Sequence, residues 1–188
     1  PGTRNYKLNE NIFSKIDNIE SAYWLGFLLA DGHLTAKNGI KISLAKYDTH
    51  LLIKFAKFVN CDNPKIHGTK RRHPKATFLV QSKKIGDDLR SIGFDEWKNG
   101  SNSDILKHIP NELFNHFIRG YFDGDGSVSY QRISLKSGIK GKKMHWSSSI
   151  VCKYENHLHA IFNKLPDNSI AKVKKRNNVY SLLFSNIS

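Results

Sequence analysis

The sequence contains little cysteine and no long apolar run. Its 188 residues include only Cys61 and Cys152, and neither stands near a second thiol or at zinc-ligand spacing from a histidine. A disulfide-bonded scaffold and a cysteine-rich zinc module are therefore excluded, and an intracellular setting, cytoplasmic or organellar, is expected. The longest apolar run, Ala22 to Ala30, is far shorter than the roughly 20 residues that cross a bilayer, and no secretory signal is visible at the N-terminus.

Acidic residues are also few. The chain has 16 Asp and Glu against 30 Lys and Arg, which gives a net charge of +14 and a pI near 9.8. A surplus of this size in a small chain favours a polyanionic partner. No basic amphipathic helix with a clean apolar face is visible, so a membrane surface is not the expected partner. The basic residues instead gather in three tracts, at 70–73, 136–143 and 172–176.

The apolar content, 39% of the residues, is enough for a core, and its periodicity predicts the elements of the first half. Residues Ser21 to Asp31 predict a buried helix with Ser21 as its N-cap. The alternation after Gly32 predicts a β-hairpin with a two-residue type I′ turn at Asn38-Gly39. Further on, the pattern predicts a helix from Asp48 or Thr49 to Asn60, strands at 65–69 and 76–81, and a helix from Ser82 to Gly93.

Residues 94–108 are polar and show no continuing period, which predicts a linker. Pro110 then begins a second apolar helix that ends, like the first, on an acid and a glycine, at Asp125-Gly126. We therefore divide the chain into an N-terminal half at 1–98, a linker at 99–109 and a C-terminal half at 110–188. The final helix expected after Ser185 is missing from the second half.

An internal repeat relates the two halves. Gly26 and Gly120 are 94 positions apart, and the same offset maps Asp31 onto Asp125. Further on, residues 46–51 match residues 153–158 at an offset of 107, and residues 78–82 match residues 181–185 at an offset of 103. The second half carries 13 extra residues, which predict a longer hairpin loop around residues 137–143. We expect the two apolar helices to pack together at Gly26 and Gly120, where the missing side chains let two backbones approach.

The two helix-ending acids, Asp31 and Asp125, are then expected to lie close together on a pseudo-two-fold axis. An aspartate that only ends its helix is the alternative, but its charge meets the negative end of the helix dipole, and two paired carboxylates repel each other. Two carboxylates that are held together despite these two unfavourable electrostatic terms indicate a bound divalent cation. Their oxygen atoms suit Mg²⁺, and Mn²⁺ or Ca²⁺ can take the same site. A calcium loop beginning at Asp123 is excluded, because its sixth and twelfth positions are Val128 and Ser134.

The segments 24–32 (WLGFLLADG) and 118–126 (IRGYFDGDG) resemble the paired motifs of the LAGLIDADG homing endonucleases. The resemblance implies an α+β fold of two pseudo-symmetric αββαββα halves, whose sheets form a DNA-binding saddle and whose motif helices pack at the interface. It implies a monomer with internal pseudo-two-fold symmetry that binds double-stranded DNA. It also implies that Asp31 and Asp125 bind the catalytic Mg²⁺ ions, and that Lys46 and Lys153 belong to the surrounding catalytic shell.

The expected function is site-specific, metal-dependent hydrolysis of both strands of a long asymmetric DNA target, which initiates intron or intein mobility. For Lys46 and Lys153, a phosphate clamp or an exposed strand end stays open as an alternative. Strand alternation and the basic tracts together assign DNA contacts to Lys41, Ser43, Lys70, Arg71, Arg72, Arg132, Lys136, Lys140, Lys142, Lys143, Lys172, Lys174 and Arg176.

Two other functions on the same scaffold stay open. One is a catalytically inactive DNA-binding regulator, and the other is an RNA maturase that uses the basic surface to help an intron fold. The presence of both Asp31 and Asp125 favours an active nuclease. A basic ribosomal or structural RNA-binding protein would account for the charge but not for the duplicated acid-ended helices.

Overall fold

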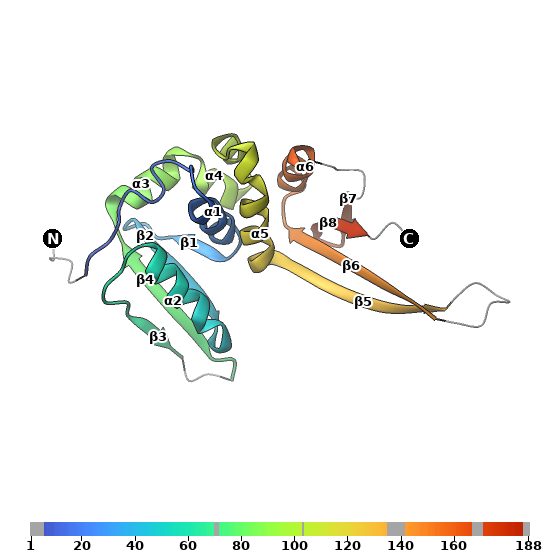
Figure 1. Cartoon of the computed structure of the whole chain (residues 1–188), viewed down its shortest axis with the longest axis horizontal. Coiled ribbons are helices and arrows are strands. Elements are labelled where there is room, and N and C mark those ends of the chain that lie inside the picture. The colour runs from blue at the N-terminus through green and yellow to red at the C-terminus, as the bar shows by residue number, and fades with distance from the viewer. Residues whose placement is uncertain (1–5, 70–71, 103, 135–141, 167–170, 186–188) are drawn as a thin grey trace. The chain divides into compact units, whose positions relative to one another are not determined.

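The computed structural model describes residues 6–69, 72–102, 104–134, 142–166 and 171–185 (Figure 1). Its internal contacts divide the chain into two compact units, Pro1–Gly124 and Asp125–Ser188. The repeat predicts a boundary between halves at residues 99–109, and the division differs because the second motif helix packs within the first unit. Among the residues that the structure describes, no helix has the length and apolarity needed to cross a membrane.

The first unit begins with the order α-β-β-α-β-β-α that the sequence predicts. The last helix of this unit, α5, ends at Asp125, the first residue of the second unit. In chain order the elements are α1 (Ile19–Asp31), β1 (Gly32–Leu34), β2 (Gly39–Ala45), the 3-10 turn η1 (Lys46–Asp48), α2 (Thr49–Phe58), β3 (Ile66–Gly68), β4 (Lys75–Gln81), α3 (Lys83–Ser91), α4 (Phe94–Asn99), the 3-10 turns η2 (Asp104–His108) and η3 (Asn111–Leu113), and α5 (Phe114–Asp125).

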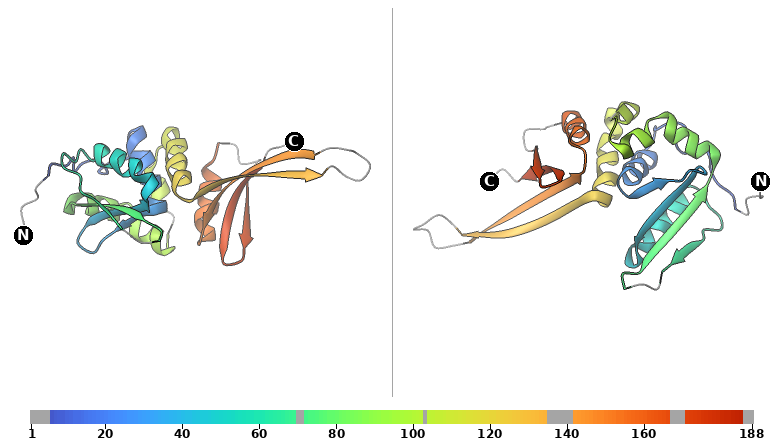
Figure 2. Two further views of the ribbon diagram at one scale, coloured as in Figure 1. Left: turned by 90° about the horizontal axis from the view of Figure 1, so that it is seen from below. Right: turned by 180° about the vertical axis from the view of Figure 1, so that it is seen from behind.

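The strands of the first unit form one antiparallel sheet in the order β1-β2-β4-β3. Ile40, Ile42 and Leu44 on β2 are buried, while Lys41 is exposed and Ser43 half-buried, so the predicted alternation of the strand is confirmed. Helix α2 covers the buried face, where the rings of Phe55 and Phe78 meet edge to face (Figures 1 and 2). The opposite face of the sheet is therefore the polar one.

Helix α1 begins earlier than predicted. Asn18, and not Ser21, is the N-cap: its side-chain oxygen accepts the Ser21 N–H at 2.9 Å, and the Ser21 hydroxyl accepts the Asn18 N–H at 3.3 Å. This reciprocal capping box places Ser21 inside the first turn, where it is fully buried. The prediction of Ser21 as the N-cap is wrong because either residue type can cap, and only the tertiary fold selects between them.

The turn between β1 and β2 also differs from the prediction. Asn38 has a positive φ of 58°, whereas Gly39 already belongs to β2. The Thr35 N–H donates to the Gly39 carbonyl at 2.7 Å, and the Thr35 hydroxyl accepts the Gly39 N–H at 2.9 Å. The hairpin therefore closes through a three-residue loop with a left-handed Asn38, and the predicted two-residue type I′ turn is wrong.

The segment predicted as a linker is structured instead. Helix α4 buries Phe94 and Trp97, and η2 buries Ile105 and Leu106. Two left-handed glycines flank α4, with φ of 95° at Gly93 and 83° at residue 100. The apolar positions are few and separated by polar residues, so no continuous period marks this segment, and it is ordered by burial against its neighbours.

Helices α1 and α5 lie side by side within the first unit, at the two predicted glycines (Figure 1). A Cβ on Gly26 would lie 2.1 Å from the Phe117 carbonyl oxygen, and a Cβ on Gly120 would lie 1.9 Å from the Tyr23 carbonyl oxygen. Each glycine thus admits the backbone of the other helix, which any side chain would exclude. The predicted packing of the two motif helices is confirmed.

The second unit repeats the topology of the first. Its antiparallel sheet has the order β5-β6-β8-β7, which matches β1-β2-β4-β3, and α6 packs on β6, β7 and β8 (Figure 2). The α+β fold with two similar halves is therefore confirmed. The elements are β5 (Gly126–Ser134), β6 (Lys142–Cys152), α6 (Glu155–Lys164), β7 (Ala171–Arg176) and β8 (Val179–Ser185).

Candidate nuclease site and nucleic-acid interface

Asp31 is the last residue of α1, and Gly32 begins β1 directly after it. Gly32 has an extended backbone with φ −79° and ψ 158°, so it is not the left-handed cap that a purely helix-ending Asp-Gly pair would form. A Cβ at Gly32 would lie 2.6 Å from the Leu28 carbonyl oxygen. The glycine therefore serves close packing between helix and strand, and it turns the chain so that Asp31 stands exposed at the helix end.

A lysine that the sequence analysis missed lies at this helix end. The Lys98 ammonium, from α4, donates to the carbonyl oxygens of Leu29 and Ala30, each at 2.9 Å. These carbonyls belong to the last turn of α1, where the dipole is negative, so the cation stabilises the helix terminus. Its sequence signal is the spacing of four residues from Phe94, inside the segment predicted as a linker.

Burial and several neighbouring charges shift the pKa of the Asp31 carboxyl group. Partial burial raises the pKa of Asp31, the nearby charge of Lys98 lowers it, Asp48 raises it, and Lys75 lowers it. Burial is the largest of these causes, so the folded protein holds this carboxylate at a net cost. A bound cation would offset that cost.

Replacement of Lys98 by methionine is expected to destabilise the protein by about 1–2 kcal/mol, because two charge-assisted bonds to the α1 carbonyls are lost. It should also raise the pKa of Asp31 further, since Lys98 now lowers it. Urea unfolding and NMR titration of the Asp31 carboxyl carbon measure the two effects. Lys107→Met is the control, because Lys107 is exposed and pairs only at the surface with Asp104. An Asp31 titration unchanged in Lys98→Met would contradict the assigned role.

Close packing extends to the C-terminal end of the helix pair. A Cβ on Gly124 of α5 would lie 2.4 Å from the Ala30 Cβ and 3.5 Å from an Asp31 carboxylate oxygen. Gly124 is the residue before Asp125, the second helix-ending acid, which is the last residue of α5. Thus the backbone of α5 reaches the Asp31 carboxylate one residue before its own terminal acid. Among the described residues, no cluster of three or more Asp, Glu, His or Cys side chains is arranged to hold a metal ion.

The two predicted shell lysines are both exposed and both follow a strand. Lys46 begins η1 after Ala45, and its backbone N–H donates to the Pro74 carbonyl at 3.0 Å. Lys153 follows β6, and its ammonium lies 5.4 Å from the centre of the Tyr154 ring. The Lys46 backbone is thus fixed by a hydrogen bond, and both exposed side chains can reach a phosphate in solvent.

Strand register corrects the equivalence of these two lysines. The motif glycines lie opposite Ile42 in the first sheet and opposite Ile150 in the second, so equivalent strand positions differ by 108 and not by 107. Lys153 therefore corresponds to Ala45, one residue before Lys46. The sequence match at offset 107 begins at the residues that follow the two strands, so it does not report the strand register.

The described DNA-facing candidates lie on the polar sides of the two sheets. Lys41 on β2 is exposed on the same face as Ser43, and Lys172, Lys174 and Arg176 alternate along one face of β7. Arg72 is also exposed. Lys70, Arg71, Lys136 and Lys140 lie outside the described residues, as does most of the extra loop around 137–143; for Arg132, Lys142 and Lys143 only the strand backbone is described.

Paired hydroxyls on these faces form a second feature that the sequence analysis missed. Ser43 and Thr77 lie across β2 and β4 with their hydroxyl oxygens 2.8 Å apart. In the second unit, Ser127 pairs with Ser149 at 3.0 Å and Ser129 with Ser147 at 2.9 Å. The alternating serines of β5 are the sequence signal for this row. Short hydroxyls can donate to or accept from either kind of base edge, so the row suits contact in a groove.

The comparisons with known proteins agree with this geometry. The family model of the LAGLIDADG-like domain matches residues 113–141, which include α5 and β5. The LAGLIDADG meganuclease I-AabMI, in a structure bound to uncleaved DNA, has a TM-score of 0.63 at 12% identity, over 90% of this chain and 79% of that one. The LAGLIDADG homing endonuclease I-LtrWI, bound to its target DNA, has a TM-score of 0.62 at 12% identity, over 95% and 80% of the two chains.

This is a LAGLIDADG fold. The resemblance seen in the two motifs is confirmed, and the second motif lies inside the matched LAGLIDADG-like segment. A third similar structure, I-SmaMI bound to uncleaved DNA with calcium ions, has a TM-score of 0.61 at 12% identity, over 96% of this chain and 80% of that one.

One curated relative is much longer than this chain. It is the replication factor C small subunit of Methanocaldococcus jannaschii, 28% identical over 187 residues. The match takes in 94% of this chain but only 9% of the relative's length.

Proposed function

We propose that this chain is a site-specific endonuclease that hydrolyses both strands of duplex DNA with a divalent metal ion. The observation that carries the proposal is the Asp31 carboxylate, exposed at the C-terminal end of α1 and next to the backbone of Gly124. Asp125 follows Gly124 directly, so the two helix-ending acids of the motif pair have the chain positions that a shared metal site needs. The DNA-bound structures of proteins with this fold support duplex DNA as the substrate.

The residues present fit Mg²⁺. This ion commonly takes one or two carboxylates and completes its octahedral shell with water and substrate phosphate oxygens, so it needs no cage of three or more protein ligands. Asp31 supplies a carboxylate whose charge is disfavoured by burial, and Asp125 would supply the second. Mn²⁺ and Ca²⁺ are alternatives with the same oxygen preference, and the calcium ions present with I-SmaMI agree with this class of ligand.

The candidate site residues would have different tasks in the reaction. Asp31 and Asp125 would hold the metal, which when bound polarises a phosphoryl oxygen and makes a bound water more acidic. Lys98 holds the last carbonyls of α1 and thereby positions Asp31 at the helix end. Lys46 and Lys153, both exposed, would stabilise negative charge that develops on the phosphate or orient the attacking water. Strand register places Lys153 one residue before the position equivalent to Lys46, so the two halves of the site would not be identical.

The proposal is tested by incubating the protein and Mg²⁺ with a randomised duplex library and sequencing the cut ends. A nuclease should yield one long, asymmetric site with breaks on both strands. Retention of one duplex without cutting would favour the inactive DNA-binding regulator instead. Acceleration of intron folding in the absence of DNA cleavage would favour the RNA maturase.

DNA binding by the sheet faces should be strongly salt-dependent, with a log–log slope of about −0.9 for each phosphate neutralised. The double replacement Lys172→Ala and Lys174→Ala should make this slope shallower by up to about 2, because each lysine would neutralise one phosphate. Lys7→Ala with Lys83→Ala changes the net charge equally at exposed positions that do not belong to β7, and should leave the slope unchanged. Fluorescence anisotropy across a salt series measures all three proteins, and equal slopes would contradict the assigned face.

We also propose that the chain initiates the genetic mobility of the intron or intein that encodes it. Because the match to the replication factor C small subunit spans only 9% of that protein, it supports a domain carried as an insertion inside a larger polypeptide, as in an intein. A mobile element of this kind should copy itself into an allele that has an intact target. A cross between target-bearing and element-bearing plasmids measures this transfer, and absence of transfer despite cleavage would contradict it.

A further inference from the structure

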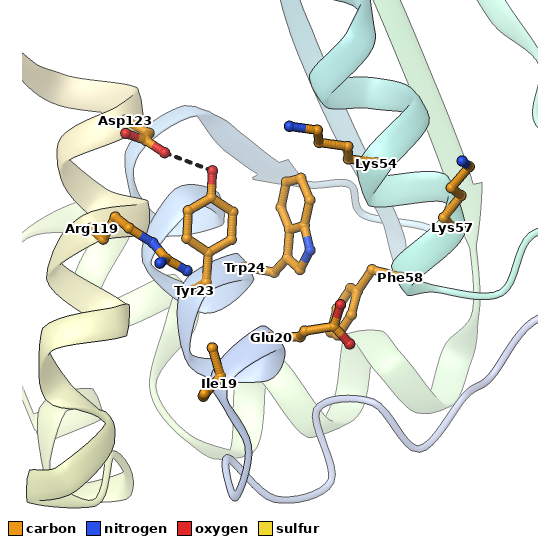
Figure 3. A pocket seen from close by; sticks show the side chains of 9 residues that line it. All are labelled: Ile19, Glu20, Tyr23, Trp24, Lys54, Lys57, Phe58, Arg119 and Asp123. Carbon is orange, nitrogen blue, oxygen red and sulfur yellow. Dashed lines mark hydrogen bonds between the residues drawn. The ribbon is translucent and has the colours of Figure 1, made fainter.

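A groove with a volume of about 570 Å³ lies between α1, α2 and α5 of the first unit (Figure 3). All its lining residues belong to this unit. It lies among the helices that cover the sheet, whereas Lys41 and Ser43 project from the opposite, polar face. Within this unit, the groove is therefore separate from the sheet face assigned above to duplex DNA, and its volume lies in the range of small-ligand sites.

Cations line both walls of the groove, and aromatic rings form its floor. Arg119 comes from α5 on one side, and Lys54 and Lys57 come from α2 on the other (Figure 3). The floor consists of Tyr23, Trp24 and Phe58, with the last two stacked at 6.1 Å and an interplanar angle of 27°.

The two acidic residues of the groove do not neutralise its positive charge. The Tyr23 hydroxyl donates to an Asp123 carboxylate oxygen at 2.7 Å, so Asp123 is held against the floor (Figure 3). Burial and this hydrogen bond raise the pKa of Tyr23, which keeps the phenol protonated as the donor. The Arg119 guanidinium lies 5.0 Å from the centre of the same ring. Glu20 is the other acid of the lining, so the three cations outnumber the two acids.

We propose that this groove is a second nucleic-acid site, which binds a nucleobase together with its phosphate. A flat base can stack on the partly exposed Phe58 ring, while its phosphate lies between Arg119 and the two lysines. This site goes beyond the proposed nuclease activity and does not depend on it. The shared chemistry of base and phosphate has two sources, a free nucleotide or an unpaired strand of RNA or DNA.

NMR titration tests the proposal with two probes, adenosine 5′-monophosphate and a 5′-phosphorylated single-stranded RNA hexamer. Both should shift the ring signals of Tyr23 and Phe58 if free nucleotides bind, and the hexamer alone should shift them if an unpaired strand is required. The variant Lys54→Gln with Lys57→Gln should weaken binding roughly tenfold, through loss of two phosphate contacts. Arg119→Gln should weaken it as well, because the opposite wall is changed.

The matched control is Lys7→Gln with Lys83→Gln, which removes the same charge at exposed positions outside the groove and should leave affinity unchanged. Equal loss in this control would show non-specific attraction and overturn the proposal. So would the absence of shifts at Tyr23 and Phe58, or the same shifts with inorganic phosphate or an acidic peptide. Duplex cleavage, measured on the same variants, should be unchanged, so failure of the groove and failure of the nuclease proposal are distinguishable.

Discussion

Replacement of Asp31 by asparagine is expected to lower the rate of DNA cleavage on the order of 1000-fold while leaving DNA affinity nearly unchanged. Asparagine preserves the size of the side chain but removes the charge that would hold the cation. The same loss is expected for Asp125→Asn, because both acids would serve one metal-dependent reaction. Metal affinity, followed by calorimetric titration beside a plasmid cleavage assay, should fall far more than DNA affinity.

The stability of the metal-free protein should move in the opposite direction. Burial raises the pKa of Asp31 above its ordinary value, so above that pKa the folded state carries a carboxylate it disfavours. Asp31→Asn should therefore stabilise the apoprotein at neutral pH, by less than about 1 kcal/mol because the carboxylate is only partly buried and is screened by water and salt. The gain should disappear as the pH falls through the pKa of Asp31. If either Asp31→Asn or Asp125→Asn still cut both DNA strands at the rate of the parent protein, the proposal of a shared metal site would be wrong.

Gly120→Ala is expected to destabilise the first unit by about 3 kcal/mol or more, because the new Cβ would meet the Tyr23 carbonyl oxygen at 1.9 Å. That atom is backbone, so relief requires α1 and α5 to move apart along their whole contact. Gly26→Ala should behave alike, since its Cβ would lie 2.1 Å from the Phe117 carbonyl oxygen. The free energy of unfolding in urea, followed by tryptophan fluorescence, measures both variants.

Gly68→Ala is the matched control for this pair. No heavy atom lies within 4 Å of a Cβ at Gly68, and its φ is not positive, so its stability should change by no more than about 0.5 kcal/mol. A Gly120→Ala protein as stable as this control would mean that the two helices do not depend on close backbone contact. The same variant should also lose cleavage, because Asp31 lies at the end of the contact that is forced apart.

Much of the fold follows from local patterns. Alternation along β2 reports its buried face directly, since a one-residue change of face would place Ile40 and Ile42 in water. The helix-glycine pattern predicted the contact between α1 and α5, because only a missing side chain permits such an approach. The acid-glycine ends of both helices, repeated at one offset, predicted the candidate site residues Asp31 and Asp125, whose roles stay predictions.

Other features could not be obtained in this way. The choice of Asn18 over Ser21 as the cap, and of a three-residue loop ending at Asn38, each depends on small energy differences that the surrounding structure decides. The one-residue difference between Lys46 and Lys153 could not be predicted either, because only the hydrogen-bond register of the strands shows it.

The sequence by itself determined the two-fold repeat, the acid at each motif helix end and the positive charge. Those depend on residue type and spacing, which are visible along the chain. The tertiary structure alone decided that Lys98 lies on the α1 carbonyls and that Arg119, Lys54 and Lys57 enclose one groove. These side chains come from helices distant in sequence, and long-range packing carries no local periodic signal by which their meeting could be read.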